Sequence, residues 1–384
     1  MNCSSSKSHH ASKISVGITG QSGFIGTHLY NTLCLYPEQY NLISFKDIFF
    51  EQKESLYEFV KSCDIIFHLA AMNRHNEPRM IYDTNIRLVK QLIAACEDTG
   101  SRPHILFASS TQEERDNLYG KSKKEGRMLF EQWAQRNNAK FAGLIIPNVF
   151  GPFGNPYYNS VVATFCHQLT HEESPKIEID GELKLIYVQE LIECLIQFIF
   201  QKSRIINYAV PHTFIITVSD LLKRLKCFKH SYLEKGIIPD ISSPFDRNLF
   251  NTFVCYIDHA GFYPFKLKLN TDERGSFVET IKLNSGGQVS FSTTKSGITR
   301  GNHFHTRKAE RFAVIKGKAR IKIRRIGTDK ITVFELDGKQ PAYVDMPVWH
   351  THNITNIGDG DLYTIFWISE HFEADDPDTF FETV

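Results

Sequence analysis

The sequence lacks both an excess of charge and a long apolar run. Lysine and arginine number 44 against 43 aspartate and glutamate residues, a formal net charge of +1 at pH 7 for 384 residues. This balance creates no overall field for nucleic acid or an anionic membrane, so we expect neither as a partner. The most apolar stretch, LIECLIQFIF, contains Glu193 and is too short to cross a bilayer.

Closely spaced cysteine pairs and an apolar leader are missing as well. The eight cysteines are scattered without a CxxC pair, and most of them sit beside apolar residues, as small core side chains do. The N-terminal MNCSSSKSHHAS is polar and has no apolar stretch of the kind that a signal peptide requires. We therefore expect a soluble cytoplasmic protein in which residues 1–12 form a disordered tail.

The distribution of apolar residues divides the chain into two parts. Between about Ile14 and Tyr208, short β-branched runs alternate with longer helical patterns. This alternation predicts a doubly wound α/β domain, with a parallel sheet covered by helices on both faces. After about Phe262 the pattern changes to short strands separated by glycine, asparagine and aspartate turns, which predicts an antiparallel β-barrel or sandwich.

The connection between the two parts is expected between Pro239 and Pro264. We assign residues 13–258 to the α/β domain and residues 259–384 to the all-β domain. A chain of 384 residues that is 42% hydrophobic and 23% charged has the length and composition for two such cores.

A glycine-rich loop follows the first predicted strand. VGITGQSGFIG places Gly20, Gly23 and Gly26 between an apolar strand and an amphipathic helix. Glycines at this point permit a tight turn and the close approach of a pyrophosphate to the helix N-terminus. The loop therefore predicts a dinucleotide site; a glycine-rich turn without a ligand is the alternative.

The second predicted strand, NLISF, is followed by Lys46 and Asp47. Dinucleotide sites often carry an acidic residue near this point, where it holds the ribose diol. A cation would instead suit a 2′-phosphate, so Lys46 favours NADPH over NADH. A solvated surface lysine is the open alternative.

The sequence YGKSK supplies a candidate proton donor. Tyr119 and Lys123 are four residues apart, so on a helix they point to the same face. An ammonium beside a phenol favours the phenolate and lowers the tyrosine pKa toward a useful value. Ser110 ends the strand pattern FASS, where ligands of open α/β sheets gather, and could hydrogen-bond a carbonyl oxygen. A Tyr–Lys pair exposed on a helix surface is the alternative reading.

These motifs resemble those of the extended short-chain dehydrogenase/reductases that act on nucleotide sugars. The shared strings are the glycine loop, HLAA at 68–71, SS at 109–110, YGKSK at 119–123 and PNVFG at 147–151. The resemblance implies a Rossmann-type fold in which Tyr119 is the acid/base, Lys123 activates it and binds the ribose, and Ser110 orients the substrate. Four further residues are assigned to the cofactor site: Phe24, Ile25, Leu69 and Ala70.

Two positions depart from the pattern of that family. Ile145 stands where an arginine is common, three residues before the asparagine of PNVFG, and Gln189 stands where an aspartate usually follows YV. Both positions weaken the transfer of substrate contacts, and neither belongs to the catalytic trio.

A second cluster of ligand-type side chains lies near the other end of the chain. GITRGNHFHTRKAERFAVIKG holds His303 and His305 one residue apart and Glu310 five residues later, and MPVWHTHNITN supplies His352. Alternation places the first two imidazoles on one face of a strand, and a hairpin brings further ligands opposite them inside a small barrel. Three imidazoles and a carboxylate suit zinc or another borderline divalent ion. Histidines that only pack or hydrogen-bond within the barrel are the alternative.

The spacing of this cluster resembles the two cupin motifs. The matching positions are Gly297, His303, His305, Glu310 and Gly317 in the first motif, and Pro347, His352 and Asn356 in the second. Trp349 replaces the usual glycine of the second motif. The resemblance implies that the all-β part is a cupin β-barrel.

A reductase followed by a cupin resembles the bifunctional enzymes of UDP-N-acetyl-L-fucosamine formation, and the strings DERGSF and PDTFFETV extend the likeness over all but the first dozen residues. The resemblance implies that the cupin epimerises C3 of a UDP-linked 4-keto-6-deoxy-HexNAc, UDP-2-acetamido-2,6-dideoxy-4-keto-hexose. It implies that the reductase domain then reduces C4 with NADPH to UDP-2-acetamido-2,6-dideoxy-β-L-talose for capsule or O-antigen polysaccharide. It further implies a divalent metal, zinc before others, and a homodimer.

Two other functions are consistent with these residues. One is a single-activity NAD(P)H-dependent 4-keto nucleotide-sugar reductase whose cupin serves only for dimerisation, and it predicts no exchange of the C3 hydrogen. The other is a non-catalytic nucleotide-sensing protein, and it predicts NADPH binding without consumption.

Overall fold

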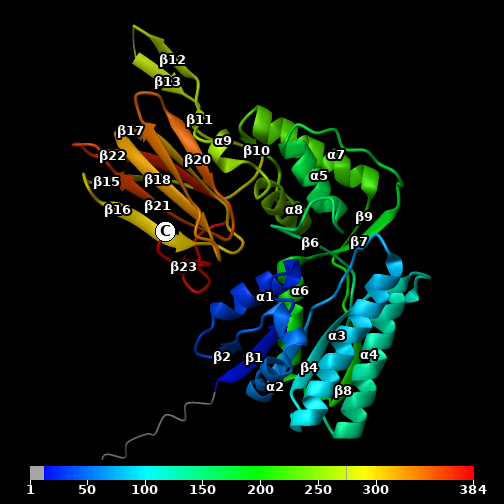
Figure 1. Ribbon diagram of the computed structural model, residues 1–384. Coiled ribbons are helices and arrows are strands. Elements are labelled where there is room, and N and C mark those ends of the chain that lie inside the picture. The colour runs from blue at the N-terminus through cyan, green and yellow to red at the C-terminus, as the bar shows by residue number, and fades with distance from the viewer. Residues whose placement is uncertain (1–12, 274) are drawn as a thin grey trace, which may run out of the picture. The chain divides into compact units, whose positions relative to one another are not determined.

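The computed structural model describes residues 13–273 and 275–384. By its internal contacts the chain divides into two units (Figure 1). The first unit consists of Met1–Val149 and Ile186–Thr213, and the second of Phe150–Leu185 and Phe214–Val384. Each unit therefore combines segments that are separated in the sequence. The predicted tail, residues 1–12, lies outside the described residues.

The first unit contains a six-stranded parallel sheet in the order β2-β1-β3-β4-β5-β8. Its strands are β1 (Ile14–Thr19), β2 (Tyr40–Ile43), β3 (Ile65–His68), β4 (His104–Ser110), β5 (Phe141–Ile146) and β8 (Ile205–Ala209). The chain passes from β1 to β2 on one side of β1, and the next crossover returns over β1 to β3 on its other side. The carboxyl ends of β1 and β3 therefore form a topological switch point, where ligands of open α/β sheets bind. The predicted doubly wound α/β fold is confirmed.

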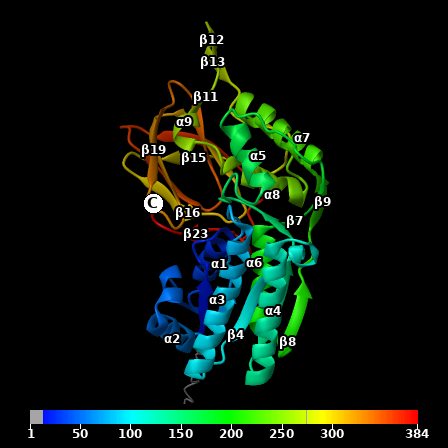
Figure 2. The ribbon, with the colours of Figure 1, turned by 45° about the vertical axis from the view of Figure 1, so that its right-hand side comes forward.

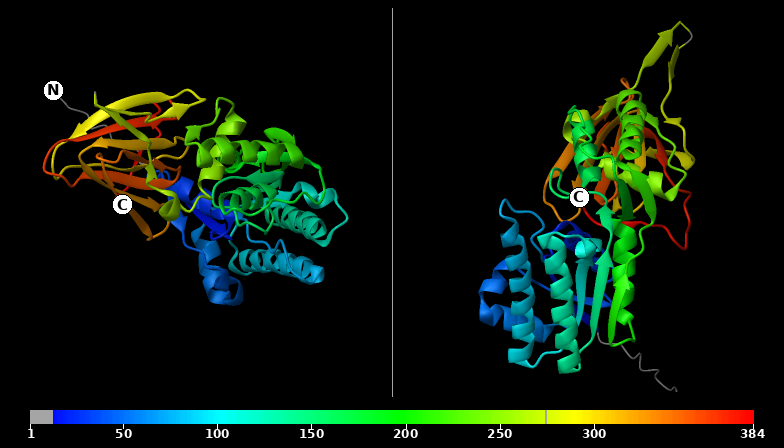
Figure 3. Two further views of the ribbon diagram at one scale, coloured as in Figure 1. Left: turned by 90° about the horizontal axis from the view of Figure 1, so that it is seen from above. Right: turned by 90° about the vertical axis from the view of Figure 1, so that its right-hand side faces the viewer.

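Helices cover both faces of this sheet. On one face α2 (Lys53–Ser62), α3 (Pro78–Thr99) and α4 (Leu118–Asn137) pack side by side (Figure 3). On the other face α1 (Phe24–Cys34) packs with α6 (Val188–Gln197). Three short 3-10 helices complete the unit: η1 (Asp47–Glu51), η2 (Thr111–Glu114) and η3 (Phe198–Phe200).

The longest helices follow directly from local sequence. Helix α4 starts at an N-cap, Asn117, whose side chain accepts a 2.7 Å hydrogen bond from Gly120 N. Phe130, Trp133 and Ala134 then recur at helical spacing and are each at most 1% exposed. They belong to the core cluster between the sheet and helices α2 to α4. Burial of this one face, rather than helix propensity, holds α4 on the sheet.

The second unit contains two five-stranded antiparallel sheets, shown in Figures 1 and 2. The first has the order β11-β20-β17-β22-β15, with β11 (Phe265–Lys266), β20 (Ala342–Met346), β17 (Glu310–Lys316), β22 (Leu362–Ile368) and β15 (Gln288–Thr294). The second has the order β19-β18-β21-β16-β23, with β19 (Ile331–Asp337), β18 (Lys318–Arg325), β21 (His350–Asn356), β16 (Thr299–Phe304) and β23 (Phe380–Phe381). Val314 and Val344 of one sheet share a buried core cluster with Ile321 and Ile354 of the other. The predicted all-β region with antiparallel sheets is confirmed.

Helices and short strands form the rest of the second unit. Helices α5 (Val161–Thr170), α7 (Val218–Phe228) and α8 (Pro244–Val254) pack together (Figure 2). The remaining elements are β6 (Asn148–Phe150), β7 (Glu182–Tyr187), β9 (Phe214–Thr217), the π-helix η4 (Lys229–Glu234), β10 (Ile237–Ile238), α9 (His259–Phe262), β12 (Leu269–Asp272), β13 (Gly275–Val278) and β14 (Lys282–Leu283). Strands β12 and β13 form a hairpin that projects from the barrel (Figure 1).

The stretch between Pro239 and Pro264, where the sequence suggested the connection, contains two helices. It forms α8 and α9, and Leu249 and Phe253 of α8 are fully buried. The proline of this helix, Pro244, occupies the first turn, where the missing N–H costs no hydrogen bond. The domain boundary between residues 258 and 259 stays a prediction. The second unit, defined by internal contacts, already includes residues from Phe214 onward.

Two expectations from composition concern the described residues. Of the cysteines among them, Cys63, Cys96 and Cys166 are buried, whereas Cys34 and Cys227 are exposed. No helix of the described part of the chain is both long and apolar enough to span a membrane.

Candidate functional site

The glycine loop lies at the topological switch point of the first unit. Gly20 has φ +72°, and a Cβ added there would lie 2.7 Å from Ala70 N, so the loop touches the segment that follows β3. Gly23 is the N-cap of α1, Phe24 is its first residue, and Gly26 is buried in its first turn. Gly23 offers no side-chain cap and the first turn holds no acidic residue. The N–H groups at this helix end are therefore suited to binding an anion.

The segment after β3 is fastened to the end of β1. Leu69 N donates to Thr19 O at 3.2 Å, and Ala70 N donates to Thr19 Oγ1 at 3.4 Å. The same hydroxyl lies 2.8 Å from His68 Nδ1. Burial, together with the charge of Lys123, lowers the pKa of His68 to about 3, so the ring is neutral at pH 7. The residues of HLAA predicted at the cofactor therefore lie beside the glycine loop.

Lys46 is placed differently from the strand end that the sequence suggested. Strand β2 ends at Ile43, and Lys46 is the exposed N-cap of η1. Phe45 turns inward instead and packs on Phe50 and Phe59, which ends the strand early. The lysine remains at the carboxyl end of the second strand, as its proposed role requires.

Tyr119 and Lys123 lie on one face of α4, next to β4. Lys123 is only 3% exposed, and its Nζ lies 4.7 Å from the ring centre of Phe107 and 5.9 Å from that of Tyr119. Burial lowers the pKa of Lys123 to about 8, although the charge of Glu113 opposes this shift. A lysine with such a pKa is poised for proton exchange near neutral pH.

Ser110 is held close to the same helix turn. It is the last residue of β4 and the N-cap of η2, where its Oγ accepts from Gln112 N at 3.2 Å. A Cβ added to Gly120 would lie 1.9 Å from Gln112 O, so the turn that carries Tyr119 presses on the turn that follows Ser110. The glycine of YGKSK permits this approach. The structure thus places Ser110, Tyr119 and Lys123 near the carboxyl end of β4.

Glu113 of η2 and Arg127 of α4 form a buried ion pair. The sequence analysis did not predict this pair. Arg127 Nε and Nη2 donate to the carboxylate of Glu113 at 2.9 and 2.7 Å, and the hydroxyl of Ser109 donates to the same carboxylate. The Glu113 side chain is 6% exposed and that of Arg127 14%. In the sequence Glu113 is part of the acidic run QEERD, which reads as surface, so no signal marked it.

The two departures from the family pattern are also placed in the first unit. Ile145 lies on β5, partly buried, and Gln189 lies in the first turn of α6. The Oε1 of Gln189 is buried and has no hydrogen-bond partner among the described residues. A buried amide oxygen without a donor is costly, and a ligand hydroxyl or amide could satisfy it.

The four ligand-type side chains predicted in the second unit converge. One ligand atom from each of His303, His305, Glu310 and His352 lies within 4.8 Å of the others. Glu310 Oε2 is 2.9 Å from His352 Nε2 and 3.2 Å from His305 Nε2. His303 pairs with His352 across β16 and β21 of one sheet, while Glu310 begins β17 of the other. The cluster therefore lies between the two sheets of the barrel.

The outer hydrogen bonds of these histidines set which nitrogen faces the cluster. His305 Nδ1 lies 2.5 Å from Asp378 O, and His352 Nδ1 lies 3.1 Å from His350 O. A carbonyl only accepts, so both Nδ1 atoms carry hydrogen and each Nε2 faces Glu310. Neither Nε2 nor Glu310 Oε2 has a regular hydrogen-bond partner among the described residues. Buried acceptors that converge in this way fit a divalent cation.

The electrostatics of the cluster agree with this fit. Burial and the neighbouring imidazole of His352 lower the pKa of His303 to about 4, which keeps the ring neutral. Burial alone would raise the pKa of Glu310, but its contacts with His305 and His352 hold it well below the usual range. Burial would lower the pKa of His305, but its contacts with Glu310 and Asp378 raise it. Metal binds the neutral imidazole, so a metal ion and a proton would compete for this residue.

Trp349, which replaces a motif glycine, keeps a backbone conformation typical of glycine. Its φ is +59°, in the left-handed region, which costs a residue with a side chain about 1–2 kcal/mol. Its N donates to His305 O at 2.7 Å, and its ring stacks on Phe304 and is 2% exposed. Burial of the indole offsets the strain, so the turn beside His305 is retained without glycine.

Comparison with known proteins supports both halves of the chain. Residues 16–209 match the NAD dependent epimerase/dehydratase family, and residues 270–380 match the polysaccharide biosynthesis C-terminal domain. The chain is 32% identical over 368 residues to the UDP-2-acetamido-2,6-beta-L-arabino-hexul-4-ose reductase of Pseudomonas aeruginosa, a match that covers 94% of this chain and 97% of that protein.

Solved structures match over the same length. The capsular polysaccharide assembling protein CapF of Staphylococcus aureus is 32% identical, with a TM-score of 0.61 over 96% of this chain and 100% of that one. A structure of CapF with the inhibitor 3-isopropenyl-tropolone is 30% identical, with a TM-score of 0.57 over 97% of this chain and 100% of the other. The chain therefore belongs to the NAD dependent epimerase/dehydratase family and, within it, is a CapF-like protein with a polysaccharide biosynthesis C-terminal domain.

Proposed function

We propose that this chain converts a UDP-linked 2-acetamido-2,6-dideoxy-4-keto-hexose in two steps, C3 epimerisation in the barrel and C4 reduction in the α/β unit. The observation that carries the proposal is the presence of two complete clusters on one chain: Ser110, Tyr119 and Lys123 near the carboxyl end of β4, and the four ligand-type residues inside the barrel. The names of the relatives, a hexul-4-ose reductase and a capsular polysaccharide assembling protein, support the same substrate class.

Epimerisation at C3 depends on the neighbouring ketone. A 4-keto group acidifies the hydrogen on C3, so a base in the barrel can remove it from one face of the ring, and a proton can return on the other. A neutral imidazole in the barrel whose nitrogen is not bound to metal could serve as this base. A divalent ion held by His303, His305, Glu310 and His352 would supply positive charge for the oxyanion, or would brace the barrel.

Reduction at C4 needs a proton for the oxygen that becomes an alkoxide. NADPH, when bound at the glycine loop, supplies the hydride, and Lys46 would favour its 2′-phosphate. Tyr119 donates the proton, Ser110 hydrogen-bonds the same oxygen, and Lys123 stabilises the phenolate that remains. Reduction removes the ketone and so prevents the new configuration at C3 from reverting. An easily reversed first step is therefore drawn forward by the second, and we propose UDP-2-acetamido-2,6-dideoxy-β-L-talose as the product of a cytoplasmic homodimer.

The test of this function is isotope incorporation. The 4-keto substrate and NADPH are incubated with the protein in deuterated water, and the product is examined by mass spectrometry and NMR. Carbon-bound deuterium at C3 of a reduced sugar is expected. Reduction without this label would support a simple reductase with a structural barrel, which the name of the Pseudomonas relative also allows. NADPH binding without turnover would overturn both enzymatic functions.

Removal of one barrel ligand is expected to release metal. His352→Ala deletes an Nε2 that lies 2.9 Å from Glu310 Oε2. Loss of a ligand should weaken zinc binding by more than the roughly 10–100-fold that loss of an outer hydrogen-bond partner costs. Elemental analysis of the purified protein measures it, with His371→Ala, an exposed histidine of the same unit, as the control. Equal metal content in both variants would remove His352 from the ligand set.

Neutralising Glu113 is expected to change the pH profile of reduction. Lys123 faces Glu113 of η2, His68 of β3 and Tyr119 of its own helix, and Glu113 supplies the negative charge that raises its pKa. In Glu113→Gln the ammonium form is lost at a lower pH, so the alkaline limb of kcat/KM should move to lower pH. The midpoint of this limb does not depend on the fraction of folded protein.

The neighbouring exposed residue provides the control for this prediction. Glu114→Gln removes a charge from the same 3-10 helix, outside the buried pair, and should leave the profile unchanged. An unchanged alkaline limb in Glu113→Gln, or the same shift in both variants, would contradict the role of Glu113.

A further inference from the structure

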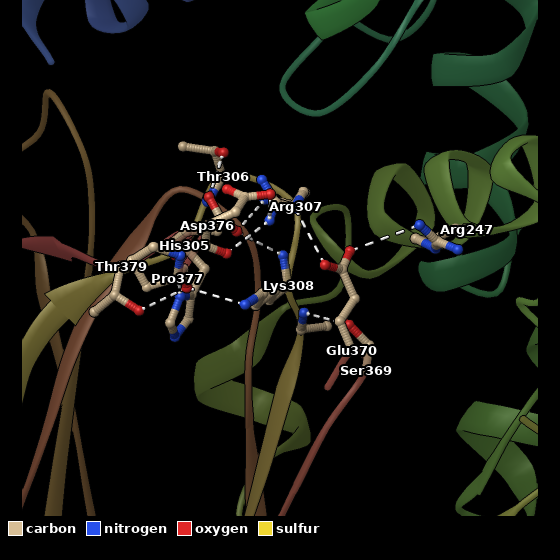
Figure 4. Close-up of polar contacts among 12 residues, drawn as sticks. Arg247, His305, Thr306, Arg307, Lys308, Ser369, Glu370, Asp376, Pro377 and Thr379 are labelled. Atoms are coloured by element: carbon tan, nitrogen blue, oxygen red, sulfur yellow. Dashed lines mark hydrogen bonds and ion pairs between the residues drawn. The ribbon is translucent and has the colours of Figure 1, made fainter. Parts of the chain in front are cut away.

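The backbone that carries the ligand His305 is held by the C-terminal segment of the chain (Figure 4). The carboxylate of Asp378 accepts four hydrogen bonds from the next three residues: Thr306 N at 3.1 Å, Thr306 Oγ1 at 2.7 Å, Arg307 N at 3.0 Å and Lys308 N at 3.2 Å. Asp378 is 5% exposed, so these bonds are shielded from water. One buried carboxylate thus orders the turn between His305 and Glu310.

The main chain of the same residue contacts the ligand itself. Asp378 O accepts from His305 Nδ1 at 2.5 Å, which directs Nε2 toward Glu310. Asp378 has φ +43°, an uncommon conformation for a residue with a side chain. The four bonds to its carboxylate hold the residue in this conformation and so place its carbonyl against the imidazole. Asp378 therefore binds the backbone of residues 306–308 through its carboxylate and the imidazole of His305 through its carbonyl.

Other contacts attach the segment around this point, as Figure 4 shows. Arg307 donates to Glu370 Oε2 at 3.1 Å and to Asp376 Oδ2 at 2.6 Å, and Lys308 Nζ donates to Pro377 O at 3.0 Å. These bonds come from side chains of the loop, whereas Asp378 accepts from three backbone N–H groups, from the hydroxyl of Thr306 and from the imidazole of His305. Asp378 alone among them reaches a ligand nitrogen.

We propose that Asp378 is a positioning residue for the metal: it fixes the tautomer and orientation of His305, and through them the affinity of the barrel for a divalent ion. This inference rests on the metal site of the proposed function. A ligating imidazole commonly donates its other N–H to a carbonyl or carboxylate, and loss of such a partner lowers metal affinity about 10–100-fold. The C-terminal segment is then part of the metal site although it contributes no ligand.

The test measures zinc binding by the full-length protein, stripped with a chelator and titrated with zinc against a chromophoric competitor. Asp378→Asn keeps the size of the side chain but faces the N–H groups of Arg307 and Lys308 with an amide that cannot accept from all of them. We expect a zinc affinity about 10–100-fold below that of the unaltered protein. Asp375→Asn, an exposed position on the same segment, should retain full affinity.

A thermal measurement separates positioning from general stabilisation. At a fixed zinc concentration the melting temperature rises with the logarithm of the zinc affinity, so the increment caused by zinc should shrink in Asp378→Asn. A purely structural residue would lower the melting temperature with and without zinc by the same amount and leave the increment intact, and that result would overturn the proposal. Full zinc affinity in Asp378→Asn would do so as well. If the unaltered protein binds no zinc, or binds it as well after His352→Ala, the metal site itself fails, and the role of Asp378 fails with it.

Discussion

Tyr119→Phe is expected to lower the rate of C4 reduction about 10²–10⁴-fold while C3 exchange continues. The substitution removes the phenol that donates a proton to the alkoxide, and general acid catalysis of this kind contributes a factor of this size. It leaves the aromatic ring, whose centre lies 5.9 Å from Lys123 Nζ, and so preserves the packing of the helix turn. The barrel cluster belongs to the other unit and is untouched.

Two assays on the same protein test this division of labour. NADPH consumption reports reduction, and loss of the C3 proton signal in deuterated water reports exchange. Tyr57→Phe, which removes an exposed hydroxyl bound to Asp98 in the first unit, should leave both rates unchanged. If Tyr119→Phe abolished exchange together with reduction, the two activities would not reside in separate clusters.

Asp345→Asn is expected to destabilise the second unit by about 3–5 kcal/mol, because it leaves a buried guanidinium without its carboxylate. Arg311 is fully buried, and its Nε and Nη2 donate to Asp345 Oδ1 and Oδ2, both at 2.8 Å. The phenol of Tyr232 donates to the same carboxylate, and Arg311 Nη1 donates to Gly236 O at 2.8 Å. The pair thus joins β17 and β20 of the barrel to the segment that follows α7.

The measurement is denaturant unfolding followed by tryptophan fluorescence, since Trp349 and Trp367 are both buried in the second unit. Asp329→Asn, an exposed position of the same barrel, should change the unfolding free energy by less than about 0.5 kcal/mol. The double variant Arg311→Met with Asp345→Leu should recover most of the loss, because replacing a buried pair by apolar groups is often neutral. A loss below about 1 kcal/mol in Asp345→Asn would show that the pair is not essential to the unit.

Much of the fold followed from local patterns. The alternation of β-branched runs with helical periods predicted the parallel sheet, because such strands are buried on both faces and need crossover helices. The short strands separated by glycine, asparagine and aspartate turns after Phe262 predicted the antiparallel sheets. Helix α8, which lies in the stretch assigned to the connection, was not predicted. The discontinuous division into units was missed because contacts between distant segments leave no period in the sequence.

The candidate sites divide in the same way. Short motifs predicted the pair Tyr119 and Lys123 and the pair His303 and His305. A spacing of four residues on a helix, or of two on a strand, places both side chains on the same face. Their supporting residues had no such signal. Glu113 is buried through its pairing with Arg127, although its acidic run reads as surface.

By itself the sequence determined the two kinds of core, the glycine loop and the residue types of both clusters, because each depends on spacing within one strand, helix or turn. Only the tertiary structure decided that the barrel ligands converge within 4.8 Å and that Asp378 reaches His305 from 73 residues away. It also decided that Asp345 neutralises a buried Arg311. A hydrogen bond between distant segments depends on how whole elements pack, and the periodicity of either segment records only which of its own faces is buried.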